Sequence, residues 1–423
     1  MCDQSAFRYG AVLAALSATW SCSGDKSDSD SGDLAGASSA LGGSAATDGS
    51  EVGGSEVDGM STGGDGTGGD GTAGAGTGGE GTGGGGTGGS TNDCPAPNPD
   101  LFAIGMDLSF QGSMPEATRA AQLESFQDHG INYVRLRTFV DPRADDGYDQ
   151  TNGNCDLAHT VEFGRQIKEA CMGLLVDFHY SDNWADPGKQ CVPAPWQDYT
   201  TIGELEAALY DYTRNAIEQL IAGGARPDMV QIGNEITPGI LIHLCDTEGL
   251  PYAGIAGYND VNGALYFWSS TDQGAPPSGG PSPGGWTNLG ILLNAAASGV
   301  RDVDPGIKIA LHLDRCDQLG TSESFIDGAR GQGVPFDVFA ESCYTGTQGQ
   351  PSDWEATFNS LSSSYPDLEL MIAEYSGEIR AANDVIYYLP NSQGVGTFSF
   401  TPNVSGSDAA IYDQIAIDYA SRL

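Results

Sequence analysis

The stretch Leu174–Gln190 reads LLVDFHYSDNWADPGKQ, and it decides the fold because an apolar run ends abruptly in polar and aromatic side chains. A short, nearly continuous apolar run is typical of a strand that is buried on both faces. Asp177, His179, Asp182 and Trp184 then follow within eight positions. A strand built only for burial would not need acids, an imidazole and an indole at its end. The stretch therefore predicts a buried parallel strand whose C-terminal end carries a functional site.

Similar apolar runs recur along the chain and alternate with amphipathic segments. We expect strands at residues 101–107, 131–137, 173–179, 228–235, 307–313, 336–342, 368–374 and 394–400. Helical segments are expected at 115–130, 157–173, 202–224, 286–304 and 410–423. Eight such units predict an α/β fold, a (β/α)8 TIM barrel rather than an open sheet. No GxGxxG motif opens a helix after the first strand, which argues against a dinucleotide-binding fold.

The first 93 residues differ in composition from the rest. Residues 1–22 contain the apolar run YGAVLAALSATWSC, which is too short to span a bilayer and is typical of an export signal. Cys22 adds a lipid anchor as an alternative to simple cleavage. Residues 23–93 are rich in Gly, Ser, Thr and Asp, as in TGGDGTGGDGTAGAG, and have too few apolar side chains to offset the entropy of ordering. We therefore expect a disordered linker, a catalytic domain at 94–423, and an exported bacterial protein that is extracellular or held at the outer surface.

The cysteines of an exported chain favour disulfide bonds. Of nine cysteines, two lie in the signal region, so seven remain and at least one must stay reduced. We expect that free thiol to be Cys171, inside the helical segment 157–173. The sequence does not fix the pairing, and our working hypotheses are Cys155–Cys191 and Cys245–Cys316.

Charge and motif content limit the partners. The chain has 17 Lys and Arg against 57 Asp and Glu, a formal net charge of −40, which argues against nucleic acid and favours a neutral substrate. No CxxC pair or His/Cys cluster with zinc spacing is present, so we expect no metal site and no cofactor, with a structural calcium left open. We expect a monomer.

Two glutamates end strands on opposite sides of the expected barrel. Glu235 closes the fourth strand in QIGNE, and Glu374 closes the seventh in MIAEY. Retaining glycoside hydrolysis needs such a pair about 5–5.5 Å apart, one carboxylate to attack the sugar and one acid to protonate the leaving oxygen. Either glutamate alone could instead cap a helix or pair with an arginine. Together they favour catalysis, with a raised pKa for Glu235 as the acid.

Other side chains at the strand ends fit sugar binding. Asn234 is placed to contact a sugar 2-hydroxyl, and Arg135 and Arg137 to pair with an ionised Glu374. Polar groups that could bind hydroxyls and indoles that could stack on sugar rings complete the set, namely Asp107, His179, Asp182, His312, Trp184 and Trp196.

Six blocks of the sequence together resemble one family. They are NYVRLRTFVDP, LLVDFHYSDNWADPGKQ, PDMVQIGNEITPGIL, IALHLD, FDVFAES and MIAEYS. In this order they resemble glycoside hydrolase family 53, the endo-β-1,4-galactanases of the (β/α)8 retaining clan, over roughly residues 103–400. The resemblance implies hydrolysis of β-1,4-galactan in the arabinogalactan side chains of pectin. It also implies Glu235 as acid/base and Glu374 as nucleophile, with Asn234, Arg135 and His179 shaping the subsite of the attacked sugar.

The chain departs from the family pattern at two strand ends. After the sixth strand it reads SCYTGTQG, which keeps Tyr344 without the usual second aromatic residue and proline. The eighth strand ends in FSFTP, with Phe400 where the family has an aromatic-Trp-Glu-Pro run. We expect Tyr344 and Phe400 to contact substrate. The alternatives are a hydrolase of the same clan that acts on another β-linked polysaccharide, and a non-catalytic carbohydrate-binding lipoprotein.

Overall fold

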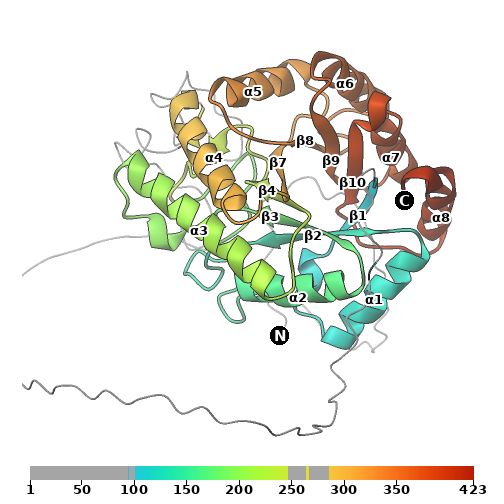
Figure 1. Cartoon of the computed structure of the whole chain (residues 1–423), viewed down its shortest axis with the longest axis horizontal. Coiled ribbons are helices and arrows are strands. Elements are labelled where there is room, and N and C mark those ends of the chain that lie inside the picture. The colour runs from blue at the N-terminus through green and yellow to red at the C-terminus, as the bar shows by residue number, and fades with distance from the viewer. Residues whose placement is uncertain (1–93, 95–100, 246–262, 266–284) are drawn as a thin grey trace, which may run out of the picture. The chain divides into compact units, whose positions relative to one another are not determined.

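Eight parallel strands close into a barrel in the computed structural model, which describes Cys94 and residues 101–245, 263–265 and 285–423. The strands are β1 (Ala103–Asp107), β2 (Tyr133–Thr138), β3 (Gly173–Phe178), β4 (Met229–Ile232), β7 (Lys308–Leu313), β8 (Val338–Cys343), β9 (Glu369–Tyr375) and β10 (Gly394–Ser399). Their order around the barrel follows the chain, and β10 closes it by pairing with β1. Figure 1 looks at this ring of strands with the helices outside it.

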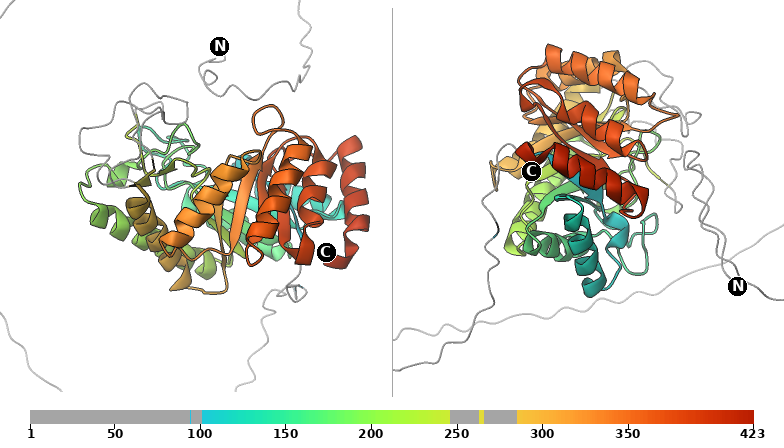
Figure 2. Two further views of the ribbon diagram at one scale, coloured as in Figure 1. Left: turned by 90° about the horizontal axis from the view of Figure 1, so that it is seen from above. Right: turned by 90° about the vertical axis from the view of Figure 1, so that its right-hand side faces the viewer.

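Helices link consecutive strands and cover the outer face of the barrel. They are α1 (Glu116–Asp128), α2 (Leu157–Glu169), α3 (Ile202–Ala222), α4 (Gly285–Arg301), α5 (Leu319–Gly331), α6 (Pro351–Ser364), α7 (Ile379–Tyr387) and α8 (Ser407–Asp418). Figure 2 shows from two further sides that they lie around the strands. A short antiparallel pair, β5 (Gly239–Ile240) with β6 (Gly263–Ala264), stands apart from the barrel sheet.

The barrel interior is filled by side chains from alternate strand positions, as the two-residue period of a strand requires. Tyr133, Leu175, Met229 and Phe398 belong to this inner cluster. Gly105 on β1 pairs with Phe398 on β10, and a Cβ at Gly105 would lie 2.2 Å from the Phe398 ring. The glycine therefore makes room for the aromatic ring that fills this layer.

The structure confirms the predicted barrel and corrects the fourth strand. That strand was expected to run to Glu235, but β4 ends at Ile232. Gly233 has φ 101° and Glu235 has φ 48°, and a chain that enters the left-handed region leaves the strand ladder. Helices α5, α6 and α7 lie between strands where we predicted no helix. The predicted signal at 1–22, the linker at 23–93 and the anchor at Cys22 lie outside the described residues.

The structure confirms that the chain forms disulfide bonds, but the pairings and the free thiol that we expected were wrong. The bonds are Cys94–Cys171, Cys191–Cys245 and Cys316–Cys343, and among the described cysteines Cys155 is the free one. Cys171 follows the end of α2 with φ 58°, so it has left the helix in which we placed it. Cys155 is instead buried against the Ser109 carbonyl, and burial raises the pKa of its thiol to about 12.

Within the described part of the chain, no helix is both long and apolar enough to cross a bilayer.

We predict that the Cys94–Cys171 bond contributes most to stability through chain entropy. It joins residues 77 positions apart, whereas Cys316–Cys343 joins residues only 27 apart. The double variant Cys94→Ser/Cys171→Ser should lose about 2–4 kcal/mol of unfolding free energy, measured by urea denaturation. The matched variant Cys316→Ser/Cys343→Ser should lose less. An equal or larger loss in the matched variant would contradict the entropic explanation.

Candidate active site

Arg135 on β2 is the charged centre of the barrel mouth. Its guanidinium lies 2.7 Å from Asp107 Oδ2, 2.7 Å from Asp177 Oδ2 and 2.8 Å from Glu374 Oε1. Burial of an unpaired guanidinium would be costly, and three carboxylates offset that cost. Burial would lower the pKa of Arg135, but the charges of Asp177, Glu374 and Asp107 outweigh it and raise that pKa. The arginine therefore stays charged and fixes one oxygen of Glu374.

The same balance acts on Asp177. Burial by itself would raise the pKa of Asp177, but the charge of Arg135 and then the interaction with His179 hold it well below its ordinary range. Asp177 also lies 3.0 Å from His179 Nε2, while His179 Nδ1 accepts the Ala185 N–H at 2.9 Å. Burial lowers the pKa of His179. His179 is thus a neutral ring held between a strand carboxylate and the loop that follows β3.

Arg135 also organises a layer of amides. Its Nε donates to Gln231 Oε1 at 2.8 Å, and its Nη2 donates to Asn234 Oδ1 at 2.8 Å. Asn234 Nδ2 donates to the Ala185 carbonyl, so both ends of that amide are fixed. The two nitrogens of His312 lie 2.9 Å from Gln231 Nε2 and 2.9 Å from Ser342 Oγ. His312 therefore has protein partners at both nitrogens.

Glu374, at the end of β9, has a partner at each carboxylate oxygen. Arg135 Nη1 lies 2.8 Å from Oε1, and Tyr344 Oη donates to Oε2 at 2.7 Å. Burial, and then the charges of Glu374 and Glu235, raise the pKa of Tyr344 well above its ordinary value. The phenol therefore keeps its proton and remains a donor to Glu374.

Glu235 lies just beyond β4, and its surroundings favour the protonated form of its carboxyl. Burial is the largest cause that raises its pKa well above the ordinary 4.5, and the charge of Glu374 is the next. A hydrogen bond from Ser342 opposes this rise without cancelling it. Glu235 is half-buried. The site thus places a carboxyl of raised pKa in the electrostatic field of an arginine-paired carboxylate.

An aromatic wall flanks the carboxyl pair. The guanidinium of Arg137 lies 4.1 Å from the Trp184 ring centroid, 4.7 Å from that of Phe400 and 5.3 Å from that of Phe110. We expected Arg137 to pair with Glu374, but it lies 2.9 Å from Asp107 Oδ2 instead. Cation–π contacts of this kind hold rings in place around a cation.

Three residues that sequence reasoning passed over belong to this mouth. Phe110 is 45% exposed and contacts both Trp184 and Phe400. Its signal is an aromatic residue three positions beyond the end of β1. Gln231 faces inward on β4 two positions after Met229, so the strand period would have identified it. Gln190 was visible only as the end of the quoted stretch.

Two residues that we expected to bind sugar, Asp182 and Trp196, make contacts within the protein. The Asp182 carboxylate accepts the backbone N–H groups of Asp141 at 2.7 Å and Ala194 at 2.6 Å, so it joins two loops. Burial, with the charge of Asp146 also contributing, raises the pKa of Asp182 to about 7. Trp196 is only 5% exposed and packs on Tyr212, which makes it a core residue and not a stacking platform.

The groups that line the site are ones that transfer protons and form hydrogen bonds. Over the described ranges, no group of three or more His, Cys, Asp or Glu side chains is arranged to hold a metal ion.

Comparison with known proteins yields a family match and several relatives. The model of glycosyl hydrolase family 53 matches residues 109–417. The endo-beta-1,4-galactanase of Bacillus subtilis is 28% identical over 67% of this chain and 56% of its own length. The arabinogalactan endo-beta-1,4-galactanase of Thermothelomyces thermophilus is 31% identical over 51% of this chain and 53% of its own length. The chain thus spans little more than half the length of these curated relatives.

A solved structure extends the likeness to three dimensions. The GH53 catalytic domain of Ignisphaera aggregans is 28% identical and has a TM-score of 0.55. The match covers 72% of this chain and 85% of that chain.

We predict that the charge of Glu374 contributes to the raised pKa of Glu235. In Glu374→Gln the pKa of Glu235 should fall toward 4.5, because a neighbouring negative charge no longer opposes ionisation. The titration can be followed by carbon-13 NMR of labelled glutamate carboxyls. Glu341 is an internal control: burial raises its pKa to about 8, and Glu374 is not among the main causes. An unchanged Glu235 titration, or an equal change at Glu341, would exclude direct coupling.

Proposed function

The chain belongs to glycosyl hydrolase family 53, and from this membership we propose that it is a retaining endo-glycosidase that hydrolyses β-1,4-galactosidic linkages. The proposed substrate is the (arabino)galactan of pectin side chains. Two galactanases among the relatives support this substrate class.

The observation that carries the proposal is the Glu235–Glu374 pair. Arg135 and Tyr344 orient Glu374. Burial and the charge of Glu374 raise the pKa of Glu235, which suits it to donate a proton. Retaining hydrolysis needs one carboxylate nucleophile and one carboxylic acid. The pair supplies both from one site.

The reaction then follows in two displacements. The Glu374 carboxylate attacks the anomeric carbon while Glu235 gives its proton to the leaving glycosidic oxygen, which leaves as a sugar hydroxyl. Glu235, now ionised, takes a proton from water as the water attacks the same carbon. The second step releases Glu374 as a carboxylate and restores the proton of Glu235, and the anomeric configuration is retained.

The neighbours take distinct roles in this proposal. Asn234 contacts the 2-hydroxyl of the attacked sugar, and Tyr344 holds the nucleophile until the bond forms. Trp184, Phe400 and Phe110 form the face against which sugar rings stack. Arg135, Asp107, His179 and His312 hold these groups through the contacts described above, and Asp182 supports the loop that bears Trp184.

The site of action is proposed to be outside the cell. Three disulfide bonds in the described residues fit an oxidising compartment, in agreement with the export signal predicted at residues 1–22. A lipid anchor at Cys22 and a monomeric state remain predictions.

One feature favours a second candidate, a hydrolase of the same clan with another β-linked substrate. The aromatic wall is built from Phe400, followed by Thr401, where the family resemblance leads us to expect an aromatic-Trp-Glu-Pro run. This change affects the sugar-binding face and leaves the carboxyl pair intact.

We expect purified protein to release oligosaccharides from β-1,4-galactan. The same preparation should be at least about tenfold less active on β-mannan and β-glucan, because a pocket rejects a misplaced hydroxyl when its polar groups are left unpaired. Reducing-end release, measured side by side on the three polymers, tests the substrate. Cleavage of mannan or glucan alone would favour the second candidate, and binding without any product would favour the non-catalytic alternative.

We expect Glu374→Ala to lose nearly all turnover, about 10⁴-fold or more, because it removes the attacking group. Azide should restore activity on a substrate with an activated aryl leaving group. The azide product should have the α configuration, because a small anion then attacks once from the face that Glu374 used. A β-configured azide, or no rescue, would count against Glu374 as the nucleophile.

A further inference from the structure

We propose that Gln190 and the Cys191–Cys245 disulfide form a clamp that positions Glu235 for proton transfer. The inference deepens the proposed function and rests on the acid/base role assigned to Glu235 there. Gln190 is a positioning residue in this account, because it acts through the Glu235 backbone.

The backbone at Glu235 needs external support. Its φ of 48° lies in the left-handed region, which side chains other than glycine rarely adopt and which costs free energy. The turn from Gly233 to Glu235 also lies beyond β4, which ends at Ile232, so the strand ladder does not hold it. Such a conformation persists only where neighbouring groups hold it.

Gln190 supplies that support from the loop after β3. Its side-chain Nε2 donates to the Asn234 carbonyl at 2.9 Å and lies 3.4 Å from the Glu235 carbonyl. The same nitrogen lies 3.2 Å from the Asp186 carbonyl. One buried amide group thus donates to the peptide carbonyl before the Glu235 Cα and lies close to the carbonyl after it.

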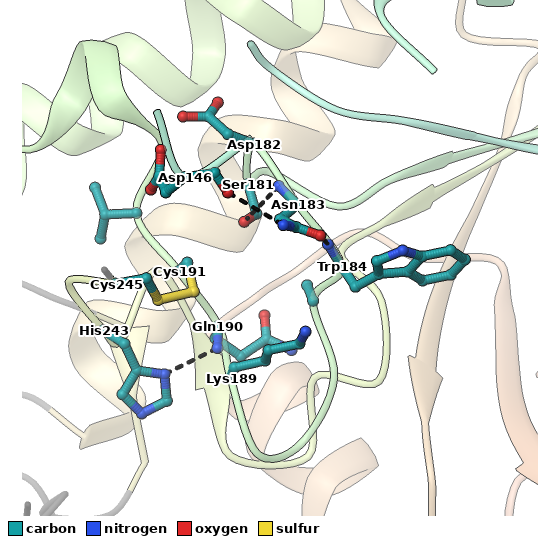
Figure 3. The surroundings of a disulfide bond; sticks show 12 residues. Asp146, Ser181, Asp182, Asn183, Trp184, Lys189, Gln190, Cys191, His243 and Cys245 are labelled. Carbon is teal, nitrogen blue, oxygen red and sulfur yellow. Dashed lines mark hydrogen bonds between the residues drawn. A yellow bond between two sulfur atoms is a disulfide. The ribbon is translucent and has the colours of Figure 1, made fainter. Parts of the chain in front are cut away.

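Gln190 is itself fixed to the loop that follows β4. Its N–H donates to His243 Nδ1 at 2.9 Å, and its carbonyl accepts the N–H groups of Ile242 at 2.8 Å and His243 at 3.0 Å. The next residue forms the disulfide to Cys245. Figure 3 shows Gln190, His243 and this disulfide side by side. Hydrogen bonds and a covalent bond therefore tie the two loops together at the point where Gln190 reaches toward Glu235.

The clamp acts on the backbone of Asn234 and Glu235, whereas the Asn234 side chain keeps its own bonds to Arg135 and to the Ala185 carbonyl. The residue after Glu235 is held by a separate bond, from the Ile236 N–H to the His312 carbonyl on β7 at 2.8 Å. Glu374 is held by Arg135 and Tyr344, neither of which contacts Gln190 in the contacts described. Loss of the clamp should therefore impair proton donation and spare nucleophilic attack.

The test is Gln190→Met, which keeps the length of the side chain and removes its donor. On an unactivated galacto-oligosaccharide kcat/KM should fall about 10- to 100-fold, because small displacements of a proton donor are costly. On a dinitrophenyl β-galactoside, whose leaving group needs no proton, the fall should stay within about threefold. Glu235→Ala removes the acid itself and is the benchmark. It should show the same difference between the two substrates, with a larger loss of kcat/KM on the unactivated one.

Gln197→Ala is the matched control. Gln197 lies in the same loop and donates to the Val192 carbonyl at 3.2 Å, away from Glu235. It should leave the ratio of the two kcat/KM values unchanged. An equal loss on both substrates by Gln190→Met, or no loss on either, would overturn the proposal.

A crystal structure of Gln190→Met tests the clamp without any activity measurement, so its outcome does not depend on the proposed function. If wild-type protein cleaves neither substrate, the proposed function fails while the clamp can still be examined. The clamp requires that residue 235 leave the left-handed region, and an unchanged φ would refute it. If Gln190→Met does not fold, Cys191→Ala/Cys245→Ala is tested for the same substrate split, with the same two outcomes.

Discussion

The buried guanidinium of Arg135 is the interaction on which the rest of the barrel mouth depends. It contacts Asp107, Asp177 and Glu374 at 2.7–2.8 Å and two amide oxygens at 2.8 Å. Each nitrogen of this guanidinium has an acceptor, which offsets the cost of removing the charge from water. These contacts bring side chains from β1, β2, β3, β4 and β9 to one point. The contacts that the buried charge of Arg135 requires thus position the side chains at the floor of the site.

The two glutamates above this floor differ in their contacts and in the pKa shift of Glu235. Glu374 lies on a strand and receives one donor at each oxygen, from Arg135 and Tyr344. Glu235 lies on a turn, where burial and the charge of Glu374 raise its pKa. The difference comes from the elements that bear them, since a strand end presents a side chain rigidly and a turn allows a carboxyl to sit away from the arginine. Arg135 pairs with Glu374, whereas burial and the charge of Glu374 act on Glu235, so two identical side chains have different environments.

The barrel and most of its mouth could be predicted from sequence because both follow from local patterns. Apolar runs gave the strands, and polar residues at their ends fall together at one rim of a parallel barrel. Glu235 was expected inside the fourth strand, yet the left-handed backbone places it three residues beyond, which no apolar pattern encodes. The disulfides were mispredicted for a related reason: Cys191 meets Cys245 only because two loops approach each other in space. Phe110 was overlooked since its role comes from its neighbours Trp184 and Phe400.

The disulfides give the loops around the site the rigidity that strands give its floor. Cys191–Cys245 joins the loops after β3 and β4, next to the residue that supports Glu235. Cys316–Cys343 joins the loop after β7 to the end of β8, one residue before the tyrosine that donates to Glu374. Loops are the least stable parts of a fold, and catalytic groups carried on them need added constraint. Each member of the carboxyl pair thus has a covalent bond close to the segment that orients it, so the geometry of the pair is set by cross-links as well as by the barrel.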